Sequence, residues 1–303
     1  MPVIAAVNEE LEDAREFARS VAGVLDRAAN GEGSRWVPGQ PPGRSDGSEL
    51  TERLDALGWD ALAGDPALVT CAGLAAVELG RRLAPLWQLD RLLGAAPAAG
   101  ELVRCLPEHT NRAWVLRGTA GAIQRCPIAA AEPCPSAAGL DVHRVAIAQD
   151  IPGEPVDPAA FATARQAWLA ASVGYLAGIG EGALSLTVDY TRQRQAFGAP
   201  LAALAPVQQR LASAATAVRG VALLAADVPD ADGLLHAGTA IASACADCQQ
   251  VSGAIAFTLE YPLHRYTQLA RALETFNAAL VGDGQPLSLA QREPVSSARQ
   301  AST

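Results

Sequence analysis

Apolar residues recur at helical spacing in the first 83 residues. From residue 9 to 28 they step by three or four positions, which predicts an amphipathic helix. The stretch 31–48 is rich in Gly, Pro and Ser and predicts a loop. Helical spacing resumes over 49–57 and stops at Gly58. Pro66 then opens a longer helix, running through Leu83, that is apolar on most faces and expected to be buried.

The middle of the chain has a different texture, with short runs separated by turn residues. We interpret 114–116, 122–126 and 140–148 as short strands, because their side chains alternate in character and turn residues lie between them. The strand region ends at Ile151-Pro-Gly-Glu-Pro155, which predicts a domain boundary.

The second half is strongly helical. Between residues 165 and 191 only Arg165, Glu181 and Asp189 are charged, so we expect this helix to be central. Three more helices are predicted over 206–226, 234–257 and 266–280. Four long helices with short connections predict an antiparallel bundle. The polar residues 283–303 are expected to form a mobile tail.

Composition narrows the functional classes. The 303 residues carry a net charge of −9, which argues against nucleic acid as a partner. All 23 basic residues are arginine, so no lysine chemistry is available. The longest apolar stretch, Ala167–Gly180, is shorter than the roughly 18 residues of a membrane span, so no membrane partner is expected. With no basic segment before an apolar run at the start, we expect a cytoplasmic protein with reduced thiols.

Three local patterns resemble redox, phosphate-binding or metal sites, but each has a simpler structural explanation. Cys245-x-x-Cys248 lies inside an apolar helix, which favours buried cysteines over a redox or zinc motif. Gly178-Ile-Gly180 and Gly182 lie mid-helix, which favours close helix packing over phosphate binding. No metal site is expected, because ligand spacing is absent among the histidines His109, His143, His236 and His264.

Two ordered motifs resemble those of acyl-CoA dehydrogenases. The first is Tyr190-Thr-Arg-Gln-Arg-Gln-Ala-Phe-Gly198, followed by Pro200 and Val207-Gln-Gln-Arg-Leu-Ala212. The second is Gln250-Val-Ser-Gly-Ala-Ile-Ala-Phe-Thr-Leu-Glu-Tyr-Pro262. The resemblance covers 165–280 well, the N-terminal helices loosely and the middle poorly.

The resemblance implies a fold, a cofactor and a reaction. The fold is mainly α: an N-terminal helical domain (1–104), a reduced β middle domain (105–160) and a C-terminal four-helix bundle (161–282). In this family FAD lies between two subunits. A glutamate removes the α-proton of an acyl-CoA thioester while the β-hydrogen passes to the flavin as hydride. The resemblance also implies an electron-transfer flavoprotein as electron acceptor.

Four residues match family positions that contact FAD. Arg194 corresponds to an arginine that reaches the FAD pyrophosphate of the neighbouring subunit, and a surface arginine is the alternative. Phe197 would pack near the flavin adenosine, or in the core. Gln250 would contact the partner's FAD, or be an interior helix residue. Gly253 would let the backbone approach the dinucleotide, and Gly198 is expected to cap a helix.

The catalytic base departs from the family pattern. One family position for the glutamate is Asn277 here, and the other is Trp168. The amide of Asn277 binds no proton near neutral pH, and the indole N–H of Trp168 is a donor only, so neither residue is a base. Glu181 and Glu274 are the nearest carboxylates in each region, and neither is in register. The family's flavin-lining segment in the middle domain has only a faint counterpart in Ala131-Glu-Pro133.

These losses resemble one known arrangement. Actinobacterial acyl-CoA dehydrogenases acting on steroid side chains can be α2β2 heterotetramers, in which a shorter subunit lacks the base and completes the FAD pocket. We therefore expect this chain to pair with a longer, catalytic homologue and to share its FAD and acyl-CoA substrate. Two alternatives stay open. One is a self-sufficient homomer with Glu274 or Glu181 as base, and the other is a flavin-free scaffold.

Overall fold

The computed structural model describes most of the chain: residues 2–30, 48–104, 106, 114–119, 122–134, 139–282, 285 and 287. The predicted loop 31–48 therefore lies outside the described residues, apart from Ser48. The same holds for the predicted tail 283–303, apart from residues 285 and 287. Leu287 itself is buried, and its carbonyl oxygen accepts a hydrogen bond from Arg165 Nε at 2.6 Å.

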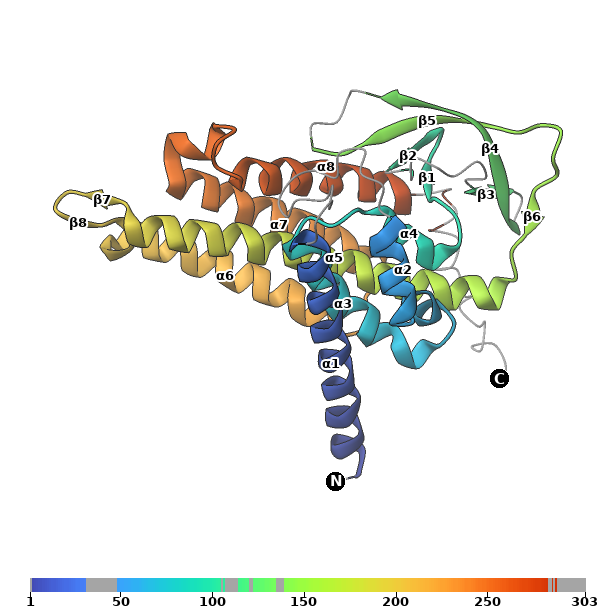
Figure 1. The fold of residues 1–303 in the computed structure, drawn as a ribbon, viewed down its shortest axis with the longest axis horizontal. Helices are drawn as coiled ribbons and strands as arrows, with labels where there is room; N and C mark the ends of the chain where they lie inside the picture. Colours follow the sequence, from blue (N-terminus) through green and yellow to red (C-terminus); the bar gives the residue numbers. More distant parts are fainter. Residues whose placement is uncertain are drawn as a thin grey trace, which may run out of the picture.

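The N-terminal part is helical, as predicted (Figure 1). Its helices and 3-10 turns are α1 (Pro2–Asn30), α2 (Ser48–Ala56), η1 (Trp59–Ala63), η2 (Pro66–Leu68), α3 (Val69–Arg81), α4 (Trp87–Asp90) and η3 (Arg91–Leu93). The helix expected from Pro66 begins instead as a 3-10 turn, because the Asp65 carboxylate accepts from the N–H of Ala67 and tightens the first turn.

The middle of the chain forms a small antiparallel sheet. Its strands are β1 (Ala98–Ala99), β2 (Leu102–Arg104), β3 (Trp114–Thr119), β4 (Ala122–Cys134), β5 (Val142–Ile147) and β6 (Glu154–Pro155). The order is β1-β2-β5-β4-β3, with β6 beside β4. The long strand β4 pairs with β3 in its first half and with β5 in its second, and its register shifts between Ile128 and Ala130. The first two strands precede residue 105, so the sheet recruits residues that the sequence assigned to the helical domain.

The C-terminal part is the predicted four-helix bundle (Figure 1). It contains α5 (Pro158–Gln193), β7 (Gln195–Ala196), β8 (Ala199–Pro200), η4 (Leu201–Ala203), α6 (Ala205–Ala225), α7 (Ala231–Ser252), η5 (Gly253–Phe257) and α8 (Leu263–Val281). Asp157 and Asp230 cap α5 and α7 through side-chain bonds to backbone N–H groups. The helix predicted over 234–257 ends earlier, at Ser252, because Gly253 takes a φ of +69° and a 3-10 turn follows.

Helix α5 is the centre of the molecule, as its few charges predict. Trp168 and Tyr175 are almost fully buried, and the Tyr175 hydroxyl donates to the carbonyl of Ala84. By length and composition α5 could cross a membrane, but 78% of its most apolar window is buried inside this fold. It is therefore a buried core helix of this fold.

Glycines let α3 and α5 meet backbone to backbone. A β-carbon added to Gly178 would overlap the carbonyl oxygen of Val77, and one added to Gly80 would overlap that of Tyr175. A β-carbon on Gly182 would likewise overlap the ring of Tyr266. The prediction that the mid-helix glycines serve close packing is confirmed at Gly178 and Gly182. The first helical domain and the bundle therefore share one core.

Candidate functional site

Two turns form one end of the bundle, which we call the bundle tip: residues 194–200 and 253–261. The first is the β7–β8 hairpin that follows α5, and the second connects α7 to α8 (Figure 1). Tyr261 holds the second turn against α5. Its hydroxyl donates to the carbonyl of Leu186 at 2.7 Å, and its ring lies 5.7 Å from the ring of Tyr190. Burial is the main cause that raises the pKa of Tyr261 to about 12, and the nearby Tyr190 and Asp189 add to it. The hydroxyl therefore stays protonated at neutral pH and can donate.

All four residues expected to contact FAD lie at or beside the bundle tip. Arg194 follows the last residue of α5 in extended conformation, and its side chain is exposed. Phe197 is 94% exposed, which excludes the core alternative. Gln250 is exposed on the last turns of α7, so it is not an interior residue. A β-carbon on Gly253 would have no neighbour within 4 Å, so the backbone there is open to a ligand.

The predicted role of Gly198 as a helix cap is wrong. Helix α5 has already ended at Gln193, and Arg194 is extended. Gly198 lies instead in the two-residue turn between β7 and β8, where Phe197 and Gly198 have φ values of +55° and +81°. Such hairpin turns require positive φ at both central residues, which suits glycine but strains phenylalanine.

The two family positions for the base lie elsewhere, in a sealed polar group that we call the inner cluster: Asp90, Arg104, Trp168 and Asn277. The Arg104 guanidinium pairs with Asp90, with Nη2 3.0 Å from Oδ1, and donates to Asn277 Oδ1 at 2.8 Å. Trp168 Nε1 donates to Asp90 Oδ1 at 2.9 Å. The guanidinium carbon of Arg104 also lies 5.4 Å from the Trp168 ring centroid, a cation–π contact.

The inner cluster is closed to solvent. Its four side chains come from α4, β2, α5 and α8, and none of the residues exceeds 5% exposure. The one carboxylate, on Asp90, is occupied by an ion pair and by the Trp168 donor. A proton acceptor for chemistry must reach its substrate, and the Asp90 carboxylate in this closed arrangement is shielded from solvent.

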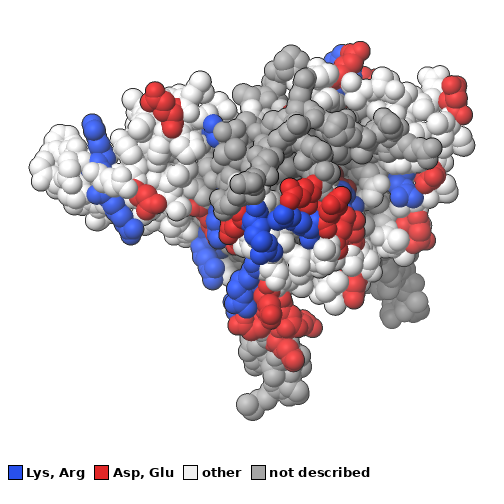
Figure 2. Space-filling model, viewed as in Figure 1, with Lys and Arg blue, Asp and Glu red and all other residues white. Residues whose placement is uncertain are grey.

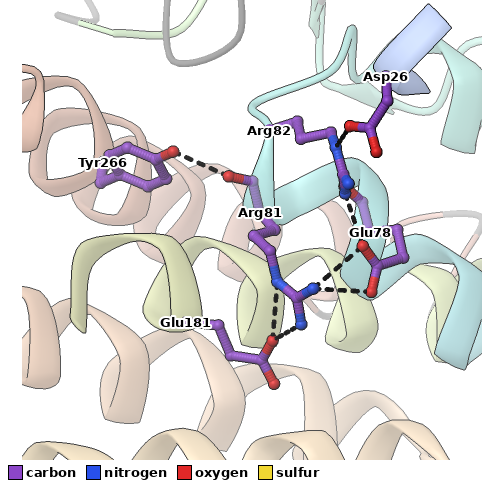
Figure 3. Close-up of polar contacts among 6 residues, drawn as sticks. All are labelled: Asp26, Glu78, Arg81, Arg82, Glu181 and Tyr266. Carbon is purple, nitrogen blue, oxygen red and sulfur yellow. Dashed lines mark hydrogen bonds and ion pairs between the residues drawn. The ribbon is translucent and has the colours of Figure 1, made fainter. Parts of the chain in front are cut away.

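The two displaced base candidates lie in different surroundings. Glu181 forms an ion pair with Arg81, which also contacts Glu78 (Figure 3). Arg82 extends this network to Asp26 of α1. Together these contacts link α1, α3 and α5. Glu274 packs against Gly238 of α7, whereas Asn277, one turn later on α8, faces Arg104.

The structure brings the sequence-predicted residues together in two groups, not one. Trp168 and Asn277 belong to the inner cluster, and Arg194, Phe197, Gln250 and Gly253 belong to the bundle tip. Along α5, the 26 residues from Trp168 to Arg194 correspond to about 39 Å at 1.5 Å per residue. The two groups therefore cannot serve one reaction centre within a single chain.

Sequence reasoning missed Arg104 and Asp90. No motif or strand interpretation included Arg104, and the residues it contacts are 14 and 173 positions away. The available signal was an arginine in a run, Leu102-Val-Arg104, that is otherwise apolar. The cysteine interpretation is confirmed: Cys245 and Cys248 are buried inside α7, and burial raises the pKa of Cys248 to about 11.

Comparison with known proteins identifies the C-terminal part. Residues 159–277 match the family described as acyl-CoA dehydrogenase, C-terminal domain. Acyl-CoA dehydrogenase IpdE2 of Mycobacterium tuberculosis is 27% identical over 243 residues, which cover 70% of this chain and 74% of that protein. Acyl-CoA dehydrogenase FadE28 of the same organism is 34% identical over 114 residues, a third of each chain (34% of both).

Solved structures show the same fold over nearly the whole chain. The ChsE4-ChsE5 complex from Mycobacterium tuberculosis matches with a TM-score of 0.66 at 17% identity, covering 89% of this chain and 94% of that one. The Tcur3481-Tcur3483 steroid ACAD matches with a TM-score of 0.62 at 18% identity, covering 94% and 96%.

Proposed function

We propose that this chain, whose residues 159–277 match the acyl-CoA dehydrogenase C-terminal domain, is the non-catalytic subunit of a heteromeric, FAD-dependent enzyme. A longer homologue supplies the base, and the bundle tip of this chain completes the homologue's FAD site. The reaction is α,β-desaturation of an acyl-CoA thioester. The complex is cytoplasmic and passes its electrons to an electron-transfer flavoprotein.

The observation that carries this proposal is the separation of the two groups of family residues. The FAD-contacting set is exposed at the bundle tip, about 39 Å along α5 from the inner cluster. The inner cluster holds Asn277 and Trp168 in a closed network around a buried ion pair. The residues that match FAD-contacting positions are exposed, whereas the family positions of the base are buried. This combination fits a subunit that completes the active site of a neighbouring subunit.

The bundle tip is chemically suited to a dinucleotide. The Arg194 guanidinium is exposed and has no ion-pair partner among the residues that the structure describes, so its fork of donors is available to a diphosphate. Phe197 offers an uncovered ring face for an adenine, and the open backbone at Gly253 allows close approach. FAD would supply the hydride acceptor, while this chain's residues bind and orient it.

Relatives support the substrate class. One structural neighbour is a complex of ChsE4 with ChsE5, and another is a steroid ACAD. We therefore propose a bulky thioester of the steroid side-chain type. The proton abstraction falls to the partner, because Glu181 is held by Arg81 and Glu274 packs against α7.

The test is flavin retention in the heteromer. We expect Arg194→Ala, in a complex with the longer homologue, to lose most of its FAD on gel filtration. Arg192→Ala is the matched control, because Arg192 is also exposed at the end of α5 but is not one of the four residues that match FAD-contacting positions. If both variants retain FAD equally, the flavin-free scaffold becomes the better explanation.

A second measurement separates the self-sufficient alternative. The purified chain without a partner is expected to be colourless and unable to reduce an electron acceptor with acyl-CoA. A yellow protein that turns over acyl-CoA alone would refute the heteromer proposal. Loss of that activity in Glu274→Gln or Glu181→Gln would then identify the base.

A further inference from the structure

The bundle tip carries the most exposed large apolar side chains of the described residues. Phe197 is 94% exposed, Leu259 84% and Phe257 70%. Every other large apolar side chain that the structure describes is less exposed, the next being Val228 at 61%. Figure 2 shows this end of the molecule as mostly uncharged surface with a few basic and acidic side chains on it. Single exposed apolar residues need no explanation, but three at one end mark an interaction site.

The backbone conformation of Phe197 also indicates an interaction site. Phe197 has a φ of +55°, a left-handed conformation that costs a non-glycine residue on the order of 1 kcal/mol. Asparagine is the usual residue at this position of a two-residue hairpin turn. A strained and uncovered phenylalanine gains nothing for the isolated chain, so its ring is best explained by a partner that covers it.

The second turn presents its apolar residues rigidly. Tyr261 ties the turn to α5, and the Thr258 hydroxyl donates to the carbonyl of Ile255 within it. Phe257 and Leu259 are therefore held outward before any partner arrives. Preorganised contacts of this kind lose little conformational entropy on binding.

We infer that Phe257 and Leu259 dock this chain onto the same partner subunit whose flavin Arg194 contacts, through an apolar contact that does not need the flavin. The inference rests on the proposed function for the partner's identity. The occupant follows from continuity, because the two residues lie on the same bundle tip as the exposed set Arg194, Gln250 and Gly253. Phe257 and Leu259 together supply on the order of 300 Å², over a third of the ~800 Å² that each partner buries in a stable interface.

The two sets of residues then have separable tasks. Phe257 and Leu259 determine the affinity between the subunits. Arg194 and Gln250 determine the affinity for FAD. Buried apolar anchors near the centre of an interface dominate its binding energy. Flavin-free subunits should therefore still pair, and the pairing should depend on Phe257 and Leu259.

The experiment measures pairing without FAD. The full chain is co-expressed with a longer acyl-CoA dehydrogenase homologue that carries the catalytic glutamate. The complex is then stripped of FAD, and the dissociation constant between the two subunits is measured. We expect Phe257→Ser and Leu259→Ser each to raise it about tenfold. Ile151→Ser is the control, because Ile151 is 53% exposed in the middle domain, away from the tip. The complexes that do form at high concentration should still bind FAD.

Each other outcome has a definite meaning. If both tip variants pair within twofold of the unaltered chain, the docking inference is overturned. If sedimentation shows the chain dimerising with itself through these residues, the occupant is a second copy and the inference is again wrong. If instead Leu259→Ser weakens pairing while Arg194→Ala keeps its FAD, the docking surface stands and the proposed flavin role fails.

Discussion

Removing the Arg104 guanidinium should strongly destabilise the chain. In Arg104→Met the Asp90 carboxylate, 5% exposed, keeps its bond from Trp168 but loses its counter-ion. Breaking a buried ion pair from one side costs about 3–5 kcal/mol, because an uncompensated charge stays inside. A domain's total stability is typically about 5–15 kcal/mol, so this loss is a large fraction of it.

The double variant identifies the mechanism. Asp90→Asn alone leaves Arg104 buried without its anion and should cost a similar amount. With both changes no charge remains, and the new asparagine can still accept from Trp168 Nε1. We expect the double variant to cost only about 1–2 kcal/mol, which implies a coupling energy of at least about 4 kcal/mol between the two positions.

Urea unfolding of the full chain, followed by tryptophan fluorescence, measures these values, and Trp168 reports directly on the cluster. Arg144→Met on β5 is the matched control, because Arg144 is exposed and should change stability by less than about 0.5 kcal/mol. If Arg104→Met costs no more than this control, the description of a sealed ion pair is wrong.

Three further predictions follow from the same structure. In urea unfolding, Gly178→Ala should lower the free energy of unfolding by about 1–3 kcal/mol or more. Gly220→Ala, on α6 with open space around it, should instead raise it by about 0.5–1 kcal/mol. Equal effects would contradict the close packing of α3 and α5. Asn277→Glu should give the chain no dehydrogenase activity in an acyl-CoA assay, because Arg104 Nη1, 2.8 Å from the Asn277 oxygen, would pair with the new carboxylate; turnover without a partner would disprove this. Burial raises the pKa of the Cys248 thiol from 9.0 to about 11, so its contribution is complete below pH 9 and up to about 2.7 kcal/mol is lost as the pH rises to 11. Cys248→Ala should flatten that decline in unfolding free energy, and an unchanged slope would exclude the thiol as its cause.

The sequence predicted the elements whose signals are local. Helical spacing identified the four bundle helices, and the mid-helix position of Gly178 and Gly182 predicted close packing. Local signals also explain the one failed assignment at the tip. Gly198 was expected to cap a helix, but whether a glycine ends a helix or turns a hairpin depends on where the preceding helix stops, and that was Gln193.

The inner cluster could not be predicted, because its parts are brought together only by the fold. Arg104 and Asn277 are 173 positions apart, and an arginine in isolation is more often exposed than buried. Resemblance to a family marked Trp168 and Asn277 as departures, but nothing in the sequence said what had replaced the lost base. The exposure of the bundle tip was likewise invisible, since motif matches give identity and not accessibility.

The close contact between α3 and α5 also bears on how this chain is made. Arg81 and Glu181, which join the two helices in Figure 3, are 100 residues apart in the chain. At about 5–20 residues per second, α3 leaves the ribosome roughly 5–20 s before α5 can cover it. During that interval α1 can cover one face of α3, but the face that packs on α5 has no partner in the chain. The bundle expressed alone would lack α3 permanently, so the family-matched segment 159–277 should aggregate when cut from the rest.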